Sequence, residues 1–142
     1  MASSKAAISA TAGKTESFYR TVFLIGAIWN VAGGVFIVVF TGWIFKLSGL
    51  TPPDPPNYYQ SWIALFTVFG IGYYLAYRDM YLNRNIILLG MIGKVAFAAD
   101  FIIDMLIYKG QIPVFFLVPV IGDLVFAVLF AGFLVWVRKQ SK

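Results

Sequence analysis

The chain has 142 residues, of which 61% are hydrophobic and 12% are charged, and its formal net charge is +5. A soluble domain has about a quarter charged residues, so this composition indicates a membrane protein. The sequence contains no cysteine and no histidine, which excludes disulfides, thiol chemistry, cysteine-ligated clusters and the usual ligands of haem, copper and zinc.

The N-terminal third of the chain begins with a polar segment and continues into an apolar one. Residues 1–17 are small, polar and lightly basic, which predicts a flexible cytoplasmic tail. A first membrane span is expected at residues 18–45, an apolar run too long for the core of a signal peptide. Residues 46–57 contain four prolines and a glycine, so we expect a stiff extracytoplasmic loop there.

Three further spans follow. The second is expected at residues 58–77 and begins with aromatic residues, including Trp62, that suit the membrane interface. Short polar turns separate it from a third span at residues 85–108 and from a fourth at residues 112–137, and residues 138–142 form a basic cytoplasmic tail. Pro119 lies inside the fourth span, where it predicts a kink or a loosening of the helix about one turn before Asp123.

Basic residues predict the orientation of these spans, because cytoplasmic loops carry an excess of lysine and arginine. Only Lys46 and Lys109 fall on the side opposite the termini; the other basic residues outside the spans share the side of the termini. The sequence therefore predicts an all-α polytopic membrane protein, residues 18–137, built as an antiparallel bundle of four transmembrane helices with both termini cytoplasmic. We expect membrane lipids as partners and no nucleic acid.

The third span is apolar enough to cross a bilayer, yet it contains charged residues. A charge near the middle of a membrane helix costs about 2.5–3.5 kcal/mol on insertion scales, so such residues usually turn inward, pair or line a wet cavity. On a helical wheel, Gly90, Gly93, Asp100 and Asp104 fall within an arc of about 80°, and Lys94 lies roughly 40° beyond its edge. This pattern predicts a face packed against other helices with its charges turned inward.

Polar residues on other spans lie at a depth similar to that of Lys94. Asp123 of the fourth span is within reach of a lysine stem of about 6 Å, so we expect a buried Lys94–Asp123 pair with Asn30 and Asp100 nearby. Such a cluster has three interpretations: it fixes helix register, it binds a polar headgroup or carries protons, or one of its charges has a partner on another subunit. Scattered aspartates without histidine or cysteine make a poor metal site, and we predict none.

The remaining candidates are peripheral. Asp104 and Lys109 lie closer to the outer surface and are expected to be hydrated. Arg78, Asp79 and Arg84 form a cytoplasmic turn that either anchors the chain at lipid headgroups or docks a partner or anionic lipid. Glycines expected to let helices pack closely are Gly33, Gly34, Gly70, Gly72, Gly90 and Gly93.

The second and third spans share motifs with a known group of proteins. A glycine-rich helix is followed by the motif Tyr-x-x-x-Arg-Asp, then by Asn-Arg-Asn and by Leu-Gly-x-x-Gly-Lys. The residues of these motifs are Gly70, Gly72, Tyr74, Arg78, Asp79, Asn83, Arg84, Asn85, Leu89, Gly90, Gly93 and Lys94. In these motifs the chain resembles the small bacterial integral membrane proteins grouped as DoxX-like. Some of those are small subunits of quinone-linked oxidoreductases, so the resemblance implies an accessory subunit in the bacterial inner membrane. It transfers no catalytic residue.

Two functions follow as expectations. The first is a non-catalytic structural or accessory subunit of a larger membrane complex, respiratory or electron-transferring, or of a homo-oligomer. The second is a small-molecule-binding or proton-handling membrane protein that uses the Lys94, Asp100 and Asp123 cluster. An enzyme is least favoured, because no nucleophile–base pair is visible. No cofactor is predicted, although the 18% aromatic content could line a pocket for a bound lipid, quinone or carotenoid.

Overall fold

The computed structural model describes residues 2–140, with side chains over residues 13–140. The described chain is helical and contains no strand: it consists of α1 (Ala2–Val39), α2 (Thr41–Ser48), α3 (Asn57–Arg78), α4 (Arg84–Ile107), a 3-10 turn η1 (Val114–Phe116) and α5 (Leu117–Gln140). The prediction of an all-helical chain is confirmed.

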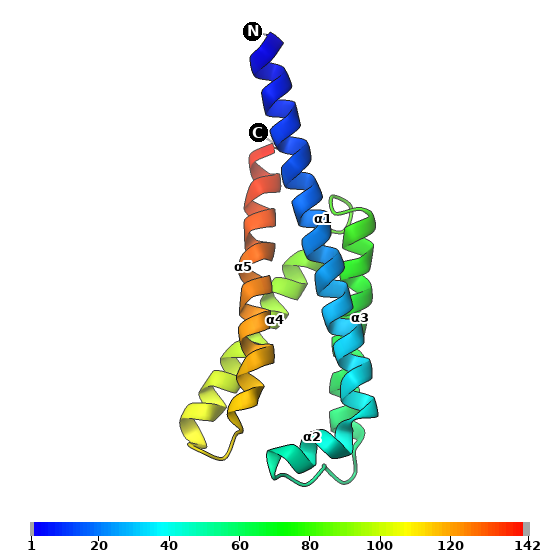
Figure 1. Ribbon diagram of the computed structural model, residues 1–142, viewed down its shortest axis with the longest axis vertical. Helices are drawn as coiled ribbons and strands as arrows, with labels where there is room; N and C mark the ends of the chain where they lie inside the picture. Colours follow the sequence, from blue (N-terminus) through cyan, green and yellow to red (C-terminus); the bar gives the residue numbers. More distant parts are fainter. Residues whose placement is uncertain (1, 141–142) are drawn as a thin grey trace.

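The four long helices form two pairs (Figure 1). α1 packs along α3 and α4 packs along α5, while contacts between the pairs are sparser. The pairs approach each other near the end that carries both chain termini and diverge toward the other end, where α2 is found (Figure 1). The two pairs therefore resemble the arms of a V.

Three segments are long and apolar enough to cross a membrane: Gly13–Val39, Arg84–Ile107 and Val114–Gln140. α3 is not among them, although its 22 residues have the required length. Its glutamine and its tyrosines, whose hydroxyls are polar, lower its mean hydropathy. Within the described residues, length and composition thus indicate a membrane protein and single out three of the four long helices.

An aromatic core joins the two pairs at the end near the termini. Phe23 of α1 packs on Phe130 and Phe133 of α5, with ring centroids 5.5 and 5.0 Å apart. Tyr73 of α3 packs on Phe130 at 5.0 Å. These four rings are at most 1% exposed, and aromatic pairs contribute about 0.5–1.5 kcal/mol each beyond the area that they bury. This core holds the arms of the V together at one end.

The first helix differs from the prediction at both ends. The segment predicted as a flexible tail is helical from Ala2 onward, because it is rich in alanine, the best helix former, and lacks proline. α1 also stops at Val39 and does not run to residue 45. The chain restarts as α2 at Thr41, whose hydroxyl donates to the Ile37 carbonyl at 2.7 Å.

The fourth predicted span also begins differently. Residues 112–113 lie outside any helix, residues 114–116 form the 3-10 turn, and α5 begins at Leu117. Pro119 therefore lies in the first turn of α5, where its missing N–H costs no helical hydrogen bond. The loosening expected before Asp123 takes the form of this turn, and not of a kink inside a continuous helix.

The glycines predicted to pack helices closely fall into two groups. A Cβ built on Gly70 would lie 2.9 Å from the Asn30 side chain of α1, and one on Gly90 would lie 2.5 Å from the Tyr73 ring of α3. Gly93 is different, because its Cβ would meet nothing within 4 Å. The structure therefore contradicts a packing role for Gly93 within the chain and places helix contacts at Gly33, Gly34, Gly70, Gly72 and Gly90.

Candidate functional site

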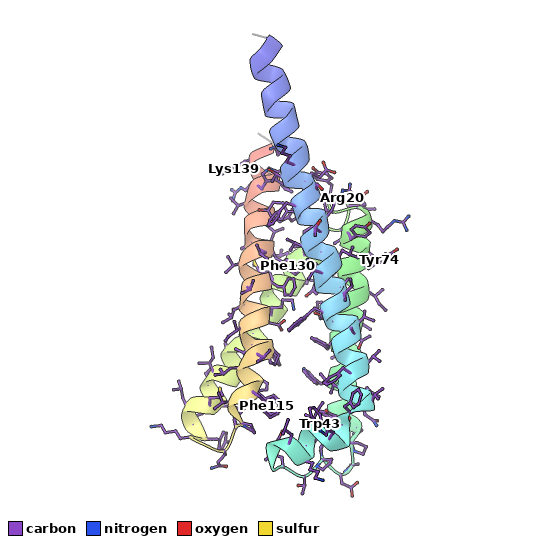
Figure 2. The ribbon with its side chains drawn as sticks, in the orientation of Figure 1. Arg20, Trp43, Tyr74, Phe115, Phe130 and Lys139 are labelled. Atoms are coloured by element: carbon purple, nitrogen blue, oxygen red, sulfur yellow. The ribbon has the colours of Figure 1, made fainter. Side chains whose placement is uncertain are left out.

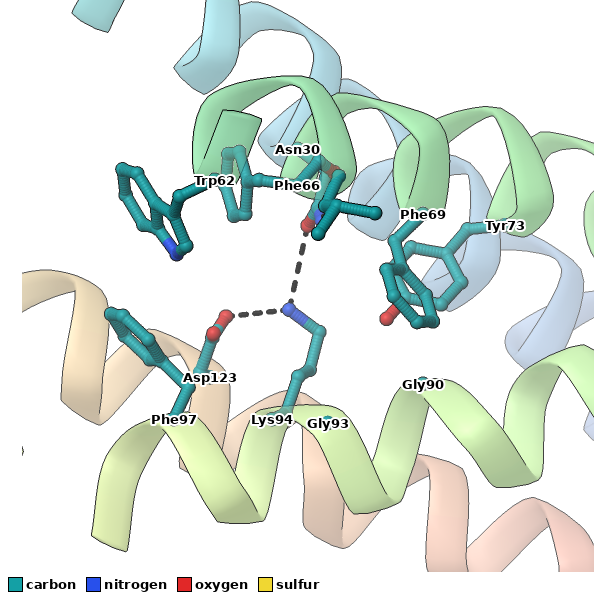
Figure 3. Close-up of a pocket in the computed structure, with 11 residues that line it drawn as sticks. Asn30, Trp62, Phe66, Phe69, Tyr73, Gly90, Gly93, Lys94, Phe97 and Asp123 are labelled. Atoms are coloured by element: carbon teal, nitrogen blue, oxygen red, sulfur yellow. Dashed lines mark hydrogen bonds and ion pairs between the residues drawn. The ribbon is translucent and has the colours of Figure 1, made fainter. Parts of the chain in front are cut away.

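A buried ion pair lies between the helices of the α4–α5 pair. Lys94 Nζ of α4 donates to Asp123 Oδ1 of α5 at 2.5 Å, and the two side chains are 4% and 7% exposed (Figure 3). The sequence predicts this pairing, and the structure shows it. Removing either partner would leave the other charge unpaired in a low-dielectric interior, which is strongly unfavourable.

Asn30 connects this ion pair to the other pair of helices. Its Oδ1 accepts from Lys94 Nζ at 3.4 Å, and its Nδ2 donates to the backbone carbonyl of Phe66 at 2.9 Å. Asn30 lies on α1 and Phe66 on α3, so one short chain of hydrogen bonds crosses all four long helices. No buried side-chain nitrogen or oxygen within residues 13–140 lacks a hydrogen-bond partner.

Aromatic rings surround the ammonium group of Lys94. Its Nζ lies 5.5 Å from the centroid of Tyr73 and 5.1 Å from that of Phe126. The electron-rich faces of these rings attract a cation, which offsets part of the cost of its burial. Tyr73 belongs to the aromatic core and Phe126 contacts its Phe130 ring, so the site is continuous with the hydrophobic core.

A second aromatic group, the Trp62 stack, bridges α3 and α4. The Trp62 ring stacks with Phe66 on α3 and with Phe97 on α4, at centroid distances of 5.8 and 6.1 Å. Figure 3 shows the indole nitrogen of Trp62 on the same side as the ion pair. No acceptor among the described side chains and carbonyls meets this N–H, and Trp62 is 37% exposed.

Two cavities adjoin the Trp62 stack. The small cavity has a volume of about 150 Å³ and contains the ion pair in its wall, with Asn30, Trp62, Tyr73 and Phe97. The large cavity has a volume of about 680 Å³ and lies between the arms of the V. Its lining comes from α1, α2, α3, η1 and α5 and is almost entirely apolar. Its aromatic members are Trp29, Phe36, Trp43, Phe45, Tyr59, Trp62, Phe66, Phe115 and Phe116.

The two cavities share part of their walls. Trp62 and Phe66 line both of them. Trp62, which the sequence suggests as an interface anchor, is therefore a wall of the candidate site. The sequence leaves open that aromatic side chains line a pocket. In the structure aromatic side chains line both of these cavities.

The inward face of α4 is not the one that the helical wheel predicts. Its buried residues are Ile87, Gly90, Lys94 and Ala98, a face rotated by about 80° from the predicted one. Asp100 is exposed, so the prediction that it joins the buried cluster is wrong. Lys94 turns inward because its partner lies on α5, whereas Asp100 has no cation within ion-pair distance among the described residues. Asp104 is half-buried and Lys109 exposed.

The predicted turn between α3 and α4 is present and is held by hydrogen bonds within the chain. Asp79 Oδ1 accepts from the backbone N–H groups of Tyr81 and Leu82 at 3.1 and 2.9 Å. This carboxylate is thus used to build the turn, whereas Arg78 and Arg84 are exposed.

Two residues that the sequence does not single out stabilise the same region. Arg20 of α1 pairs with Glu16 at 2.9 Å and donates to the carbonyls of Tyr77 and Arg78, at 3.1 and 3.3 Å, at the end of α3. Burial and the neighbouring Glu16 carboxylate raise the pKa of Tyr81, which donates to Glu16 at 3.3 Å. The i, i+4 spacing of Glu16 and Arg20 is the only sequence signal for this contact.

Over the part of the chain that the structure describes, fold and site define an all-helical protein with three helices apolar enough to cross a membrane, a buried ion pair and two adjoining cavities. Within residues 13–140 no group of three acidic, histidine or cysteine side chains is placed to hold a metal ion. Comparison of the chain with models of protein families, with curated proteins and with solved structures found no match. The likeness to DoxX-like proteins rests on the motifs alone.

Proposed function

We propose that the chain is a four-helix integral membrane protein in which α3 is the fourth span and both termini are cytoplasmic. α3 has 22 residues, and a helix of that length extends about 33 Å, enough for a hydrocarbon core of about 30 Å. It packs along α1, so the two helices share the same depth. Figure 2 shows the basic side chains Arg20 and Lys139 at the end with the termini, where the positive-inside rule places the cytoplasm.

We further propose that this protein binds a lipid-soluble small molecule between the two arms of the V. The observation that supports this function is the large apolar cavity of about 680 Å³. Pockets for small ligands commonly measure about 300–1,000 Å³ and are lined by apolar and aromatic side chains with few polar groups. The large cavity meets both criteria.

The position of the large cavity suits a ligand that arrives through the membrane. It lies away from the aromatic core, toward α2 and η1, and Trp43 and Phe115 lie on its two sides (Figure 2). In the proposed orientation this is the outer half of the bilayer. A lipid-soluble molecule would enter from that leaflet without crossing water, and it would replace lipid chains against the aromatic walls.

The binding function is tested by extracting the purified protein. The full chain, purified in mild detergent, is extracted with organic solvent, and the extract is analysed by mass spectrometry for a lipophile at near-stoichiometric amount. Ala32→Trp places a large ring in the large cavity, whereas Ala64→Trp places the same ring on the exposed side of α3, away from both cavities. The proposal requires that only Ala32→Trp loses the molecule. Equal extracts from both variants and from the native chain would contradict it.

A second candidate function, an accessory subunit of a larger membrane complex, is favoured by Asp100. This carboxylate is exposed on α4, a helix apolar enough to span a membrane. An exposed membrane carboxylate is costly in lipid, and a basic partner on another subunit would offset that cost. Purification in mild detergent through a tag on the C-terminus tests this function: stoichiometric co-purifying subunits, lost in Asp100→Asn, support it, and a chain that purifies alone contradicts it.

A further inference from the structure

The small cavity has an unusual lining for a membrane protein interior, because hydrogen-bonding groups of both kinds converge on it. Lys94 Nζ and the Trp62 indole N–H are donors, and the Asp123 carboxylate is an acceptor (Figure 3). Lys94 and Asp123 are 3% and 5% exposed as whole residues, so both charged groups are buried in the wall of the small cavity.

The small cavity is electrically neutral. Lys94 and Asp123 compensate each other, and the other residues of its wall are uncharged: Asn30, Trp62, Leu65, Phe66, Phe69, Tyr73, Gly90, Gly93 and Phe97. A ligand with a charged end would bring an unpaired charge into this interior, which is strongly unfavourable. An uncharged polar end avoids that cost.

The small cavity is large enough for the end of a ligand and not for its body. Its volume of about 150 Å³ falls below the range of about 300–1,000 Å³ that is usual for small-molecule pockets. Trp62 and Phe66 line both cavities, so the two cavities adjoin at these side chains and the end of a molecule seated in the large cavity can lie in the small one.

From this geometry we propose that the ligand is an uncharged lipid alcohol, an inference that rests on the proposed binding function. Its apolar body occupies the large cavity and its hydroxyl reaches the small one. A hydroxyl both accepts and donates, so it accepts from the Trp62 N–H or from Lys94 and donates to Asp123. An ether or ketone would only accept, and a carboxylate or an amine would disturb the neutral pair.

Four probes that share one apolar body test the preference for a hydroxyl: farnesol, farnesyl methyl ether, farnesoic acid and farnesylamine. Each is titrated into the detergent-solubilised full chain, and native mass spectrometry measures the bound fraction. One additional hydrogen bond corresponds to about fivefold in affinity. We expect farnesol to bind about fivefold more tightly than its methyl ether, and both charged probes to bind less tightly than the ether.

Variants assign that preference to the small cavity. Lys94→Met/Asp123→Leu removes both charges together and is expected to bind alcohol and ether equally. Trp62→Phe keeps an aromatic ring against Phe97 and removes the indole N–H, so it is expected to weaken alcohol and ether alike and to leave their ratio unchanged, because both accept from this donor. An alcohol-to-ether ratio near one in the native chain, or an unchanged ratio in the double variant, overturns the lipid-alcohol proposal.

The experiment separates the two proposals. If alcohol and ether bind equally and Ala32→Trp abolishes binding of both, the large cavity binds lipophiles and only the lipid-alcohol proposal is wrong. If no probe binds the native chain, or if binding is the same in Ala32→Trp, both proposals are wrong.

Discussion

Lys94 of α4 donates a hydrogen bond to Asn30 of α1 across the boundary between the two helix pairs. Lys94 is paired with Asp123 within its own pair of helices, and Asn30 is bound to the Phe66 carbonyl within the other. Each group is therefore held by a second hydrogen bond within its own pair of helices. Their contact sets the depth at which one pair docks against the other, which is the kind of register role that buried polar groups can perform.

The ion pair should show strong coupling between its partners. Lys94→Met leaves the Asp123 carboxylate buried without its cation, and breaking one side of a buried pair costs about 3–5 kcal/mol. Lys94→Met/Asp123→Leu removes both charges, so we expect a free energy of unfolding close to that of the native chain. Unfolding by sodium dodecyl sulfate of the detergent-solubilised protein, followed by circular dichroism, measures all four members of the cycle. Additive losses in the double variant would contradict this prediction.

Gly90 and Gly93 form a matched pair on α4. The Cβ of Gly90→Ala would press on Tyr73, which is 1% exposed and held by Phe130, so the ring has no room to move. Overpacking of this kind costs about 1–3 kcal/mol. Gly93→Ala meets nothing, and the higher helix propensity of alanine is expected to leave stability unchanged or raise it by up to about 1 kcal/mol. The same unfolding assay compares them; equal losses would show that Tyr73 is not the obstacle.

Arg20 should stabilise the end of α3. Arg20→Ala removes the donors to the Tyr77 and Arg78 carbonyls, so we expect the last turn of α3 to open more often. Hydrogen–deuterium exchange over residues 75–82 measures this opening, and its rate should rise while exchange in α5 stays unchanged. Arg84→Ala serves as the control, because Arg84 is exposed and makes no such contact. Similar exchange in both variants would contradict a capping role for Arg20.

Membrane topology can be measured by labelling introduced cysteines, and the native chain gives no background labelling because it has no cysteine. If four helices span the membrane with both termini in the cytoplasm, Thr51 lies outside the cell and Leu82 and Gln140 lie inside. We expect a membrane-impermeant maleimide to label Thr51→Cys in intact cells, and to label Leu82→Cys and Gln140→Cys only after permeabilisation. Labelling of residues 51 and 82 from the same side would show that α3 does not cross the membrane.

Composition and hydrophobic runs predict the helices well, because length and apolarity decide where a helix can cross a bilayer. The Lys94–Asp123 pair could also be predicted, since depth along two antiparallel helices follows from residue counting. The break at Phe40 could not, because residues 36–41 contain no proline or glycine to mark it.

The orientation of Asp100 could not be predicted for a different reason. The helical wheel groups the carboxylates with Gly93 and treats their face as the inward one, but it does not show which neighbour each face meets. In the structure α5 lies on the side of Lys94 and Ala98, so Asp100 faces outward. The cavities likewise depend on the divergence of the two pairs, a property of tertiary packing for which the sequence has no local signal.

Because the two helix pairs meet at one end and diverge at the other, a rotation of one pair about their contact moves its far end the most. The pairs touch at the aromatic core around Phe23. Counted along α1 from Phe23, Asn30 lies about 10 Å away and Phe40 lies about 25 Å away. A rigid rotation of one arm that changes the distance at the Asn30–Lys94 bond therefore changes the width near α2 about two and a half times as much. For such a rotation, a small change in the 3.4 Å distance between Lys94 Nζ and Asn30 Oδ1 accompanies a larger change in the width of the large cavity near α2.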